Sequence, residues 1–166
     1  MSSSATAEAE KILFKANEKL ALSQVSEALD ILLELTGIYP EFGKAYFMMG
    51  TIYTNSFSDF TTGESYFKKA ISLTPEYSAT YLAYAEMLIQ QERFTEAIAV
   101  LNKSLEMPGV KKDKANYLFG MMYELQTKFE DAISYYKKAI SLTLSEEIIA
   151  LCEKAMNRCN LKKKYS

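Results

Sequence analysis

The nine residues YFKKAISLT at positions 66–74 occur again at positions 135–143 as YYKKAISLT, with eight of the nine unchanged. The segments before the two copies are also alike: YFMMGTIY (46–53) and NYLFGMMY (116–123) each place a tyrosine three residues after a glycine. Between them, TYLAYAEML (80–88) has the same layout, with an alanine in place of the glycine. The chain is therefore built from an internal repeat.

Small and large residues recur through this repeat at fixed positions. Gly50, Ala85 and Gly120 are 35 residues apart. A second ladder of aromatic residues stands three positions before a small residue, at Phe60, Phe94 and Phe129. Small side chains allow two helices to approach closely, and large side chains fill the space between neighbouring pairs. One helix pair cannot bury its own apolar face, so such pairs must stack and each must present the same packing surface.

These residues resemble the tetratricopeptide repeat family, whose 34-residue unit has large, small and proline positions at set offsets. The second unit fits best, with one extra residue in the turn SFSDF (56–60); its matching residues are Tyr46, Met49, Gly50, Tyr53, Gly63, Phe67, Ala70 and Pro75. The third and fourth units fit more loosely. In the fourth, Asn116 replaces the aromatic residue and Leu144 replaces the proline. The N-terminal unit fits least.

The resemblance implies an all-α fold, a right-handed superhelical solenoid of antiparallel helix pairs with a C-terminal capping helix. We expect four helical hairpins, at 8–41, 42–76, 77–111 and 112–144, followed by the capping helix at 145–161. Residues 1–7 are expected to form a disordered lead-in and residues 162–166 a basic tail. Helices are predicted at 5–21, 24–38, 42–55, 60–73, 77–90, 93–106, 112–126, 129–142 and 146–161.

Composition favours one soluble domain with an apolar core, because 49% of the 166 residues are hydrophobic. The net charge of -2 gives no general attraction to nucleic acid or to an anionic membrane surface. No apolar run is long enough to span a bilayer, and the start of the sequence lacks the pattern of a signal peptide. These features predict a cytoplasmic protein without nucleic-acid or membrane partners.

The sequence contains no histidine, which removes the commonest general base and metal ligand. Cys152 and Cys159 lie seven residues apart in a predicted helix, roughly 10 Å along its axis, too far for a disulfide within it. We expect buried free thiols, with intermolecular pairing or metal binding as the alternatives. Glu146 and Glu147 sit at a helix start, where they stabilise the helix dipole. With no phosphate-binding loop either, we predict no enzyme activity, no metal and no cofactor.

The family resemblance implies a protein-protein interaction module, a scaffold or adaptor that binds a peptide or partner segment in an apolar concave groove formed by the first helix of each unit. The family's groove offsets fall here on Asn17, Lys44, Phe47, Met48, Thr51, Asn55, Leu82, Glu86, Gln90, Lys114, Tyr117 and Met121. One member class grips a C-terminal carboxylate with lysine, asparagine and arginine at five such positions. Whether that class is aligned with the first three units of this chain or with the last three, only one of the five positions has the required residue. We therefore expect the bound ligand to be an apolar or amphipathic segment.

Other interpretations remain open. The apolar groove residues would also suit packing on the chain's own terminal helices or on a second copy, so a self-associating structural subunit, such as a homodimer, is one alternative. A small tetratricopeptide-type chaperone for another protein is a second. RNA binding is a third, because pentatricopeptide repeats are also 35-residue helix pairs, but the ladder of glycine, tyrosine and alanine and the acidic balance disfavour it.

Overall fold

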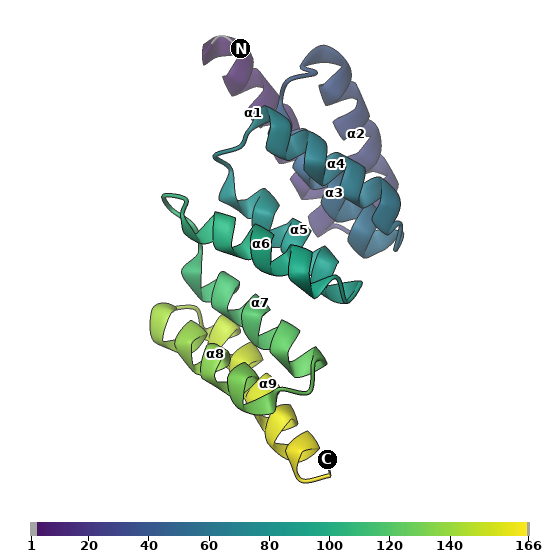
Figure 1. Ribbon diagram of the computed structural model, residues 1–166. Helices are drawn as coiled ribbons and strands as arrows, with labels where there is room; N and C mark the ends of the chain where they lie inside the picture. Colours follow the sequence, from purple (N-terminus) through teal and green to yellow (C-terminus); the bar gives the residue numbers. More distant parts are fainter. Residues whose placement is uncertain (1–2, 166) are drawn as a thin grey trace. The chain divides into compact units, whose positions relative to one another are not determined.

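The computed structural model describes residues 3–165 and consists, over those residues, of helices and connecting turns without strands (Figure 1). The helices are α1 (Ser3–Ala21), α2 (Val25–Ile38), α3 (Gly43–Ser56), α4 (Phe60–Leu73), α5 (Ser78–Gln90), α6 (Phe94–Leu105), α7 (Lys112–Leu125), α8 (Phe129–Leu142) and α9 (Glu146–Lys163). Each predicted helix is present, and its ends differ from the prediction by two residues at most. The all-α prediction is confirmed.

The two ends of the described chain are more helical than the sequence indicated. α1 begins at Ser3, so the part of the expected lead-in that is described is helical, while Met1 and Ser2 lie outside the described residues. α9 begins where predicted, because the Ser145 side chain accepts the Ile148 N–H at 3.4 Å and caps the helix. It continues to Lys163, two residues into the segment expected to be a tail.

The chain divides into two compact units, whereas its composition had favoured one domain. Unit 1 extends to Thr80 and unit 2 begins at Tyr81, so the division falls inside α5. In a repeat protein each repeat contacts only its neighbours, so the chain has no single central core to which every helix contributes. The two units are described separately below.

In unit 1, α1 packs on α2, α2 on α3, and α3 on α4. α3 and α4 approach closely at Gly50, because a methyl group there would lie 2.8 Å from the Phe67 ring and 3.2 Å from the Gly63 carbonyl oxygen. The space beside Gly50 is therefore already filled by Phe67. The core of the unit also contains the buried side chains of Ala9, Ala16, Ala28, Leu32, Leu35, Ala45, Met49 and Ile52.

In unit 2, α7 packs on α8, and α9 packs mainly on α8 and also on α7. Gly120 repeats the packing of Gly50: a methyl group there would lie 2.6 Å from the ring of Tyr136. The core around Tyr136 joins α8 to α9 and contains Phe129, Ala132, Ala139, Cys152, Ala155 and Cys159. α9 thus covers the apolar side of the last helix pair, as expected of a capping helix.

The turn inside each helix pair has a residue with positive φ that is not glycine, at Ser23, Ser58, Glu92 and Thr127. In three turns the next residue donates its N–H to the carbonyl five residues earlier, at 2.9 Å, as in a Schellman motif: Gln24 to Lys19, Arg93 to Leu88, and Lys128 to Tyr123. In the α3–α4 turn the equivalent bond, from Asp59 to Tyr53, spans six residues. This difference confirms the extra residue predicted in SFSDF.

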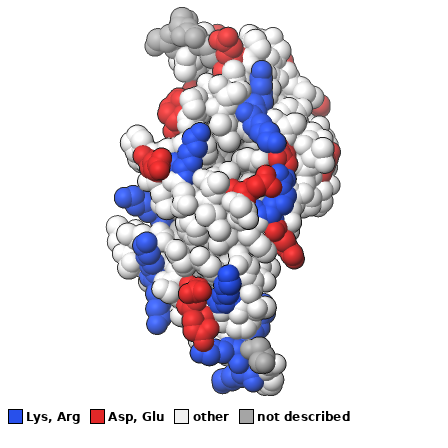
Figure 2. Space-filling model, in the orientation of Figure 1, with Lys and Arg blue, Asp and Glu red and all other residues white. Residues whose placement is uncertain are grey.

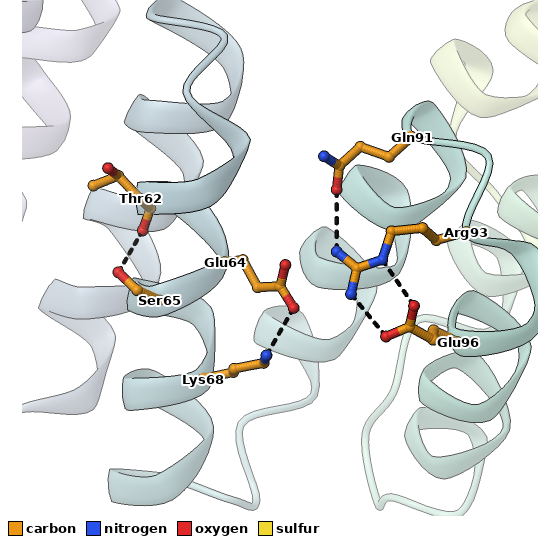
Figure 3. A network of polar contacts seen from close by, with 7 residues as sticks. All are labelled: Thr62, Glu64, Ser65, Lys68, Gln91, Arg93 and Glu96. Carbon is orange, nitrogen blue, oxygen red and sulfur yellow. Dashed lines mark hydrogen bonds and ion pairs between the residues drawn. The ribbon is translucent and has the colours of Figure 1, made fainter.

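Short-range ion pairs lie on the surface of each unit (Figure 3). On α4 of unit 1, Lys68 pairs with Glu64 one turn earlier at 2.8 Å. At the start of α6 in unit 2, the Arg93 guanidinium donates to both carboxylate oxygens of Glu96, at 2.8 and 2.7 Å, and to Gln91 at 3.3 Å. Each pair has one exposed and one half-buried partner. Surface pairs of this kind contribute at most about 1 kcal/mol each, so they support local helix structure more than the fold.

Candidate partner-binding surfaces

The residues predicted to bind a partner in unit 1 lie on α1 and α3. Asn17 of α1 and Asn55 of α3 are exposed, and Lys44, Phe47 and Thr51 of α3 are half-buried. We call these five residues the α1–α3 face. Met48, the sixth predicted residue of this unit, is buried in the core cluster.

Lys44 is held in place by contacts within unit 1. Its ammonium group pairs with the Glu10 carboxylate on α1 at 2.5 Å and lies 5.6 Å from the centre of the Tyr77 ring. The same ring packs edge-on against Phe47, with the ring centres 5.4 Å apart. Lys44 therefore links two first helices instead of presenting an unpaired cation to a ligand carboxylate.

The predicted residues of unit 2 lie on α5 and α7. Gln90 is exposed, and Glu86, Lys114 and Met121 are half-buried. We call these four residues the α5–α7 face. Glu86 and Lys114 form an ion pair at 3.0 Å that joins α5 to α7. Both predicted lysines are thus paired with a glutamate on the preceding first helix, which disfavours a carboxylate clamp further.

The other two predicted residues of unit 2 belong to its interior. Leu82 is buried. The Tyr117 ring lies 5.7 Å from the Tyr136 ring and packs against the core cluster that includes Cys152 of α9. For Tyr117 the structure therefore shows packing on the chain's own C-terminal helix, one of the alternatives that the sequence left open.

A buried ion cluster that sequence reasoning missed joins α7, α8 and α9. The Glu124 carboxylate is buried and accepts hydrogen bonds from Arg158 at 2.5 and 2.7 Å, from Lys162 at 3.1 Å and from the Tyr136 hydroxyl at 3.1 Å. Burial by itself would raise the pKa of Glu124, but the hydrogen bonds from Arg158 and Lys162 outweigh it and lower the pKa to about 2. The carboxylate is ionised at neutral pH and ties α9 to α7.

A signal for this cluster is present in the repeat pattern. By the 35-residue spacing, Glu124 stands where the two preceding repeats have Thr54 and Ile89, and both of those side chains are buried. A charged residue at an inward position requires a partner of opposite charge. The ladder of small residues continues from Gly120 to Ala155 in α9. The repeat pattern therefore indicates that α9 packs on this position and supplies the partner of Glu124.

The two cysteines are free and fully buried, as predicted. Burial raises the pKa of both thiols to about 11, and the nearby Glu124 carboxylate contributes to the shift at Cys159. Very little thiolate is therefore present at neutral pH, so neither side chain is activated for thiol chemistry. Within residues 3–165, no cluster of three or more histidine, cysteine or acidic side chains is arranged to hold a metal ion.

No helix in the described part of the chain is long and apolar enough to cross a bilayer. Models of the tetratricopeptide repeat match residues 57–107 and 113–145, together about half of the chain. The first match begins just before α4 and ends just after α6. It therefore covers α4, the second helix of one pair, and the whole of the next pair, α5 and α6. The second match covers α7 and α8.

Two relatives resemble this chain over part of their length. Anaphase-promoting complex subunit 7 of Dictyostelium discoideum is 26% identical over 123 residues, which cover 74% of this chain and 21% of that protein. The mitochondrial import receptor subunit TOM70 of Mus musculus is 25% identical over 148 residues, which cover 86% of this chain and 24% of that protein. The chain thus spans less than a quarter of the length of these curated relatives.

Solved structures of low sequence identity share the fold. PilF of Pseudomonas aeruginosa superimposes with a TM-score of 0.83 at 15% identity, covering 98% of this chain and 72% of that one. A thermophilic TPR protein of Thermus thermophilus gives a TM-score of 0.76 at 17% identity, covering 89% and 81%. The repeat ladders, the helix pairs with their close glycine contacts, and the matching repeat models agree. The chain belongs to the tetratricopeptide repeat family.

Proposed function

We propose that this protein is an adaptor with two separate binding faces, the α1–α3 face of unit 1 and the α5–α7 face of unit 2, each of which holds a segment of another protein. The observation that carries the proposal is the exposure pattern of the first helices. Within α3 and α7, the residues that contact the second helix, such as Gly50 and Gly120, are buried, while Asn55 and Met121 remain accessible. These accessible positions are not needed for packing within their own unit.

The relatives support a binding role. One is a subunit of the anaphase-promoting complex and the other a subunit of a mitochondrial import receptor, so both take part in protein assemblies. Repeats of this type are generally scaffolds without catalytic activity, and we extend the protein-binding role to this chain on that basis.

The chemistry of the two faces favours a segment with apolar and neutral polar side chains. Lys44 and Lys114 already neutralise Glu10 and Glu86, so neither face presents a strong unpaired charge. Met121 offers an adaptable apolar contact, and the amides of Asn17, Asn55 and Gln90 offer hydrogen bonds. An amphipathic helix or an extended segment of mixed polarity suits such a surface better than a charged terminus.

Site-specific photocrosslinking tests the proposal. A photoreactive phenylalanine analogue is introduced singly at Asn55 and Gln90 on the first helices, and at Ser65 and Ser134 on the second helices as matched controls. All four positions are exposed. Illumination in lysate of the native cells should crosslink one common partner from Asn55 or Gln90, and none of it from the two serine positions.

The crosslinked partner should then be lost when Met121→Arg is added, because the arginine places an unpaired charge on the α5–α7 face. Unchanged circular dichroism and melting temperature would show that the variant remains folded. Crosslinks of equal yield from Ser65 and Ser134 would contradict the proposal and indicate binding through the opposite surface. A crosslink to a second copy of the same chain would favour the self-associating alternative.

A further inference from the structure

Three exposed apolar side chains meet at the C-terminal end of unit 2. Leu125 of α7 is 49% exposed, Leu161 of α9 is 57% exposed, and Tyr165 just beyond α9 is 88% exposed. Together with the buried Phe129 ring they line one cavity of about 500 Å³. Single exposed leucines are ordinary on protein surfaces, whereas several that converge on one cavity indicate an interaction site.

The packing of the repeats does not explain these leucines. By the 35-residue spacing, Leu125 stands where the preceding repeats have Asn55 and Gln90, both exposed amides. Counting on along α9 by the same spacing, Leu161 stands where the preceding repeat has Gln126. Both positions are thus polar in the second and third repeats and apolar at this cavity; in the first repeat the same count reaches Leu20 and Ala21.

The C-terminal half of α9, which forms one side of the cavity, is basic. From Lys154 to Tyr165 the sequence carries five cations and no acidic residue. Over the whole of 81–166 there are 13 lysines and arginines against 11 acidic residues, whereas 1–80 has 6 against 10. The space-filling view shows lysine and arginine side chains gathered near the C-terminal end of α9 (Figure 2).

Ion pairs within unit 2 neutralise only part of this positive charge. Glu124 accepts from both Arg158 and Lys162, and Glu130 pairs with Lys163 at 2.5 Å. Two carboxylates thus face three cations, and Lys164, just beyond α9, adds one more positive charge at this helix end. The apolar cavity is consequently rimmed by a net positive potential.

We infer that this cavity, named here the Leu125–Leu161 cavity, docks an acidic segment of a partner protein through one bulky apolar side chain. The apolar anchor fills the space between Leu125, Phe129, Leu161 and Tyr165. Carboxylates on either side of the anchor face the lysines of α9, which fixes the orientation and speeds association. The cavity shares no residue with the α1–α3 and α5–α7 faces, although Leu125 lies one turn beyond Met121 on α7, so its test uses other substitutions and another probe than the test of the proposed function.

The concave shape favours a protein segment over a lipid surface. A cavity accepts a single protruding side chain, such as a leucine or phenylalanine of a protein segment. A bilayer surface would contact Leu161 and Tyr165 but leave the cavity beside Phe129 unfilled. Phosphatidylserine vesicles therefore serve as the competing probe in the test.

The test is fluorescence anisotropy with the full chain and a labelled peptide that has a leucine-phenylalanine pair flanked on both sides by aspartates. The peptide should bind, and binding should weaken as salt increases. The double substitution Leu125→Ser with Leu161→Ser should weaken peptide binding by about ten-fold or more, because the Leu125–Leu161 cavity loses two of its apolar side chains. Leu33→Ser with Leu142→Ser is the matched control: these leucines are 49% and 48% exposed on α2 and α8 and should leave binding unchanged.

A second peptide with lysines in place of the aspartates checks the role of charge, and it should bind about ten-fold or more weakly. Equal affinity for the two peptides, or an equal loss in the two double variants, would overturn the inference. So would sedimentation with phosphatidylserine vesicles without any binding of the acidic peptide, an outcome that would make the helix end a membrane contact. All the substituted leucines are largely exposed, so thermal melts should confirm that each variant folds.

Discussion

At the scale of single residues, the repeated nonapeptide is explained by what its members contact. Phe67 and Tyr136, one in each copy, fill the space against Gly50 and Gly120 on the preceding helix. The small residues three positions later are fully buried in both copies. The paired lysines between them are exposed in both copies. The segment recurs because the same helix crossing is built twice.

Gly120→Ala should lower the free energy of unfolding by about 1–2 kcal/mol, since the added methyl group would lie 2.6 Å from the Tyr136 ring. Gly37→Ala in α2 is the control, because nothing lies within 4 Å of a methyl group there. That variant should be neutral or slightly more stable, owing to the higher helix propensity of alanine. Urea denaturation measures both, and equal behaviour of the two variants would contradict the close contact at Gly120.

Glu124 should make the stability depend on pH in the acid range. Its pKa is lowered from 4.5 to about 2 in the folded protein, so it stabilises the fold above pH 4.5. That contribution should decrease as the pH falls from about 5 towards 2 and the carboxylate becomes protonated.

The Glu124→Gln variant provides the reference for this prediction. It should be less stable than the wild type by about 2 kcal/mol at pH 7, because Arg158 and Lys162 lose their carboxylate partner. The difference should narrow below pH 4.5. Denaturation curves across the pH range measure it, and a difference that stays constant down to pH 2 would show that the carboxylate charge is not responsible.

At the scale of helices and turns, the Schellman-type turns are a repeated feature that uses no glycine. Serine, glutamate and threonine occupy the left-handed position, which is least favourable for a β-branched residue such as Thr127. Thr127→Gly should therefore raise the free energy of unfolding by about 0.5–1 kcal/mol, measured by thermal or urea unfolding. Thr127→Ala should bring no comparable gain, and a destabilising glycine would argue against the left-handed turn.

Helix positions were predictable because they follow from the small, aromatic and proline residues that recur at fixed offsets in each repeat. The left-handed turns were not, since glycine usually signals them and here serine, glutamate and threonine adopt them. Tyr117 and Leu82 were assigned to a binding surface by their offsets, but burial depends on which neighbouring helices pack over them. The offsets also placed Glu124 in the groove, and its buried ion cluster was missed because its partners lie 34 and 38 residues later, on α9.

At the scale of the whole molecule, the two compact units present separate candidate faces, each aligned by an ion pair between first helices. The pairs are Glu10 with Lys44 in unit 1 and Glu86 with Lys114 in unit 2. The family, the all-α fold and the general binding role could be anticipated from the repeat ladders. The identity of the partner segment could not, because it depends on side chains that the repeat packing leaves unconstrained.

The central claim is that these faces are available to another protein and are not covered by a second copy of the chain. Light scattering coupled to size-exclusion chromatography, in reducing buffer over a series of concentrations, tests it most directly. The account predicts a constant mass near 18.8 kDa, the mass of one chain. A dimer whose fraction increases with concentration, and that is absent in the Met121→Arg variant, would contradict the claim. The α5–α7 face would then be a contact between subunits.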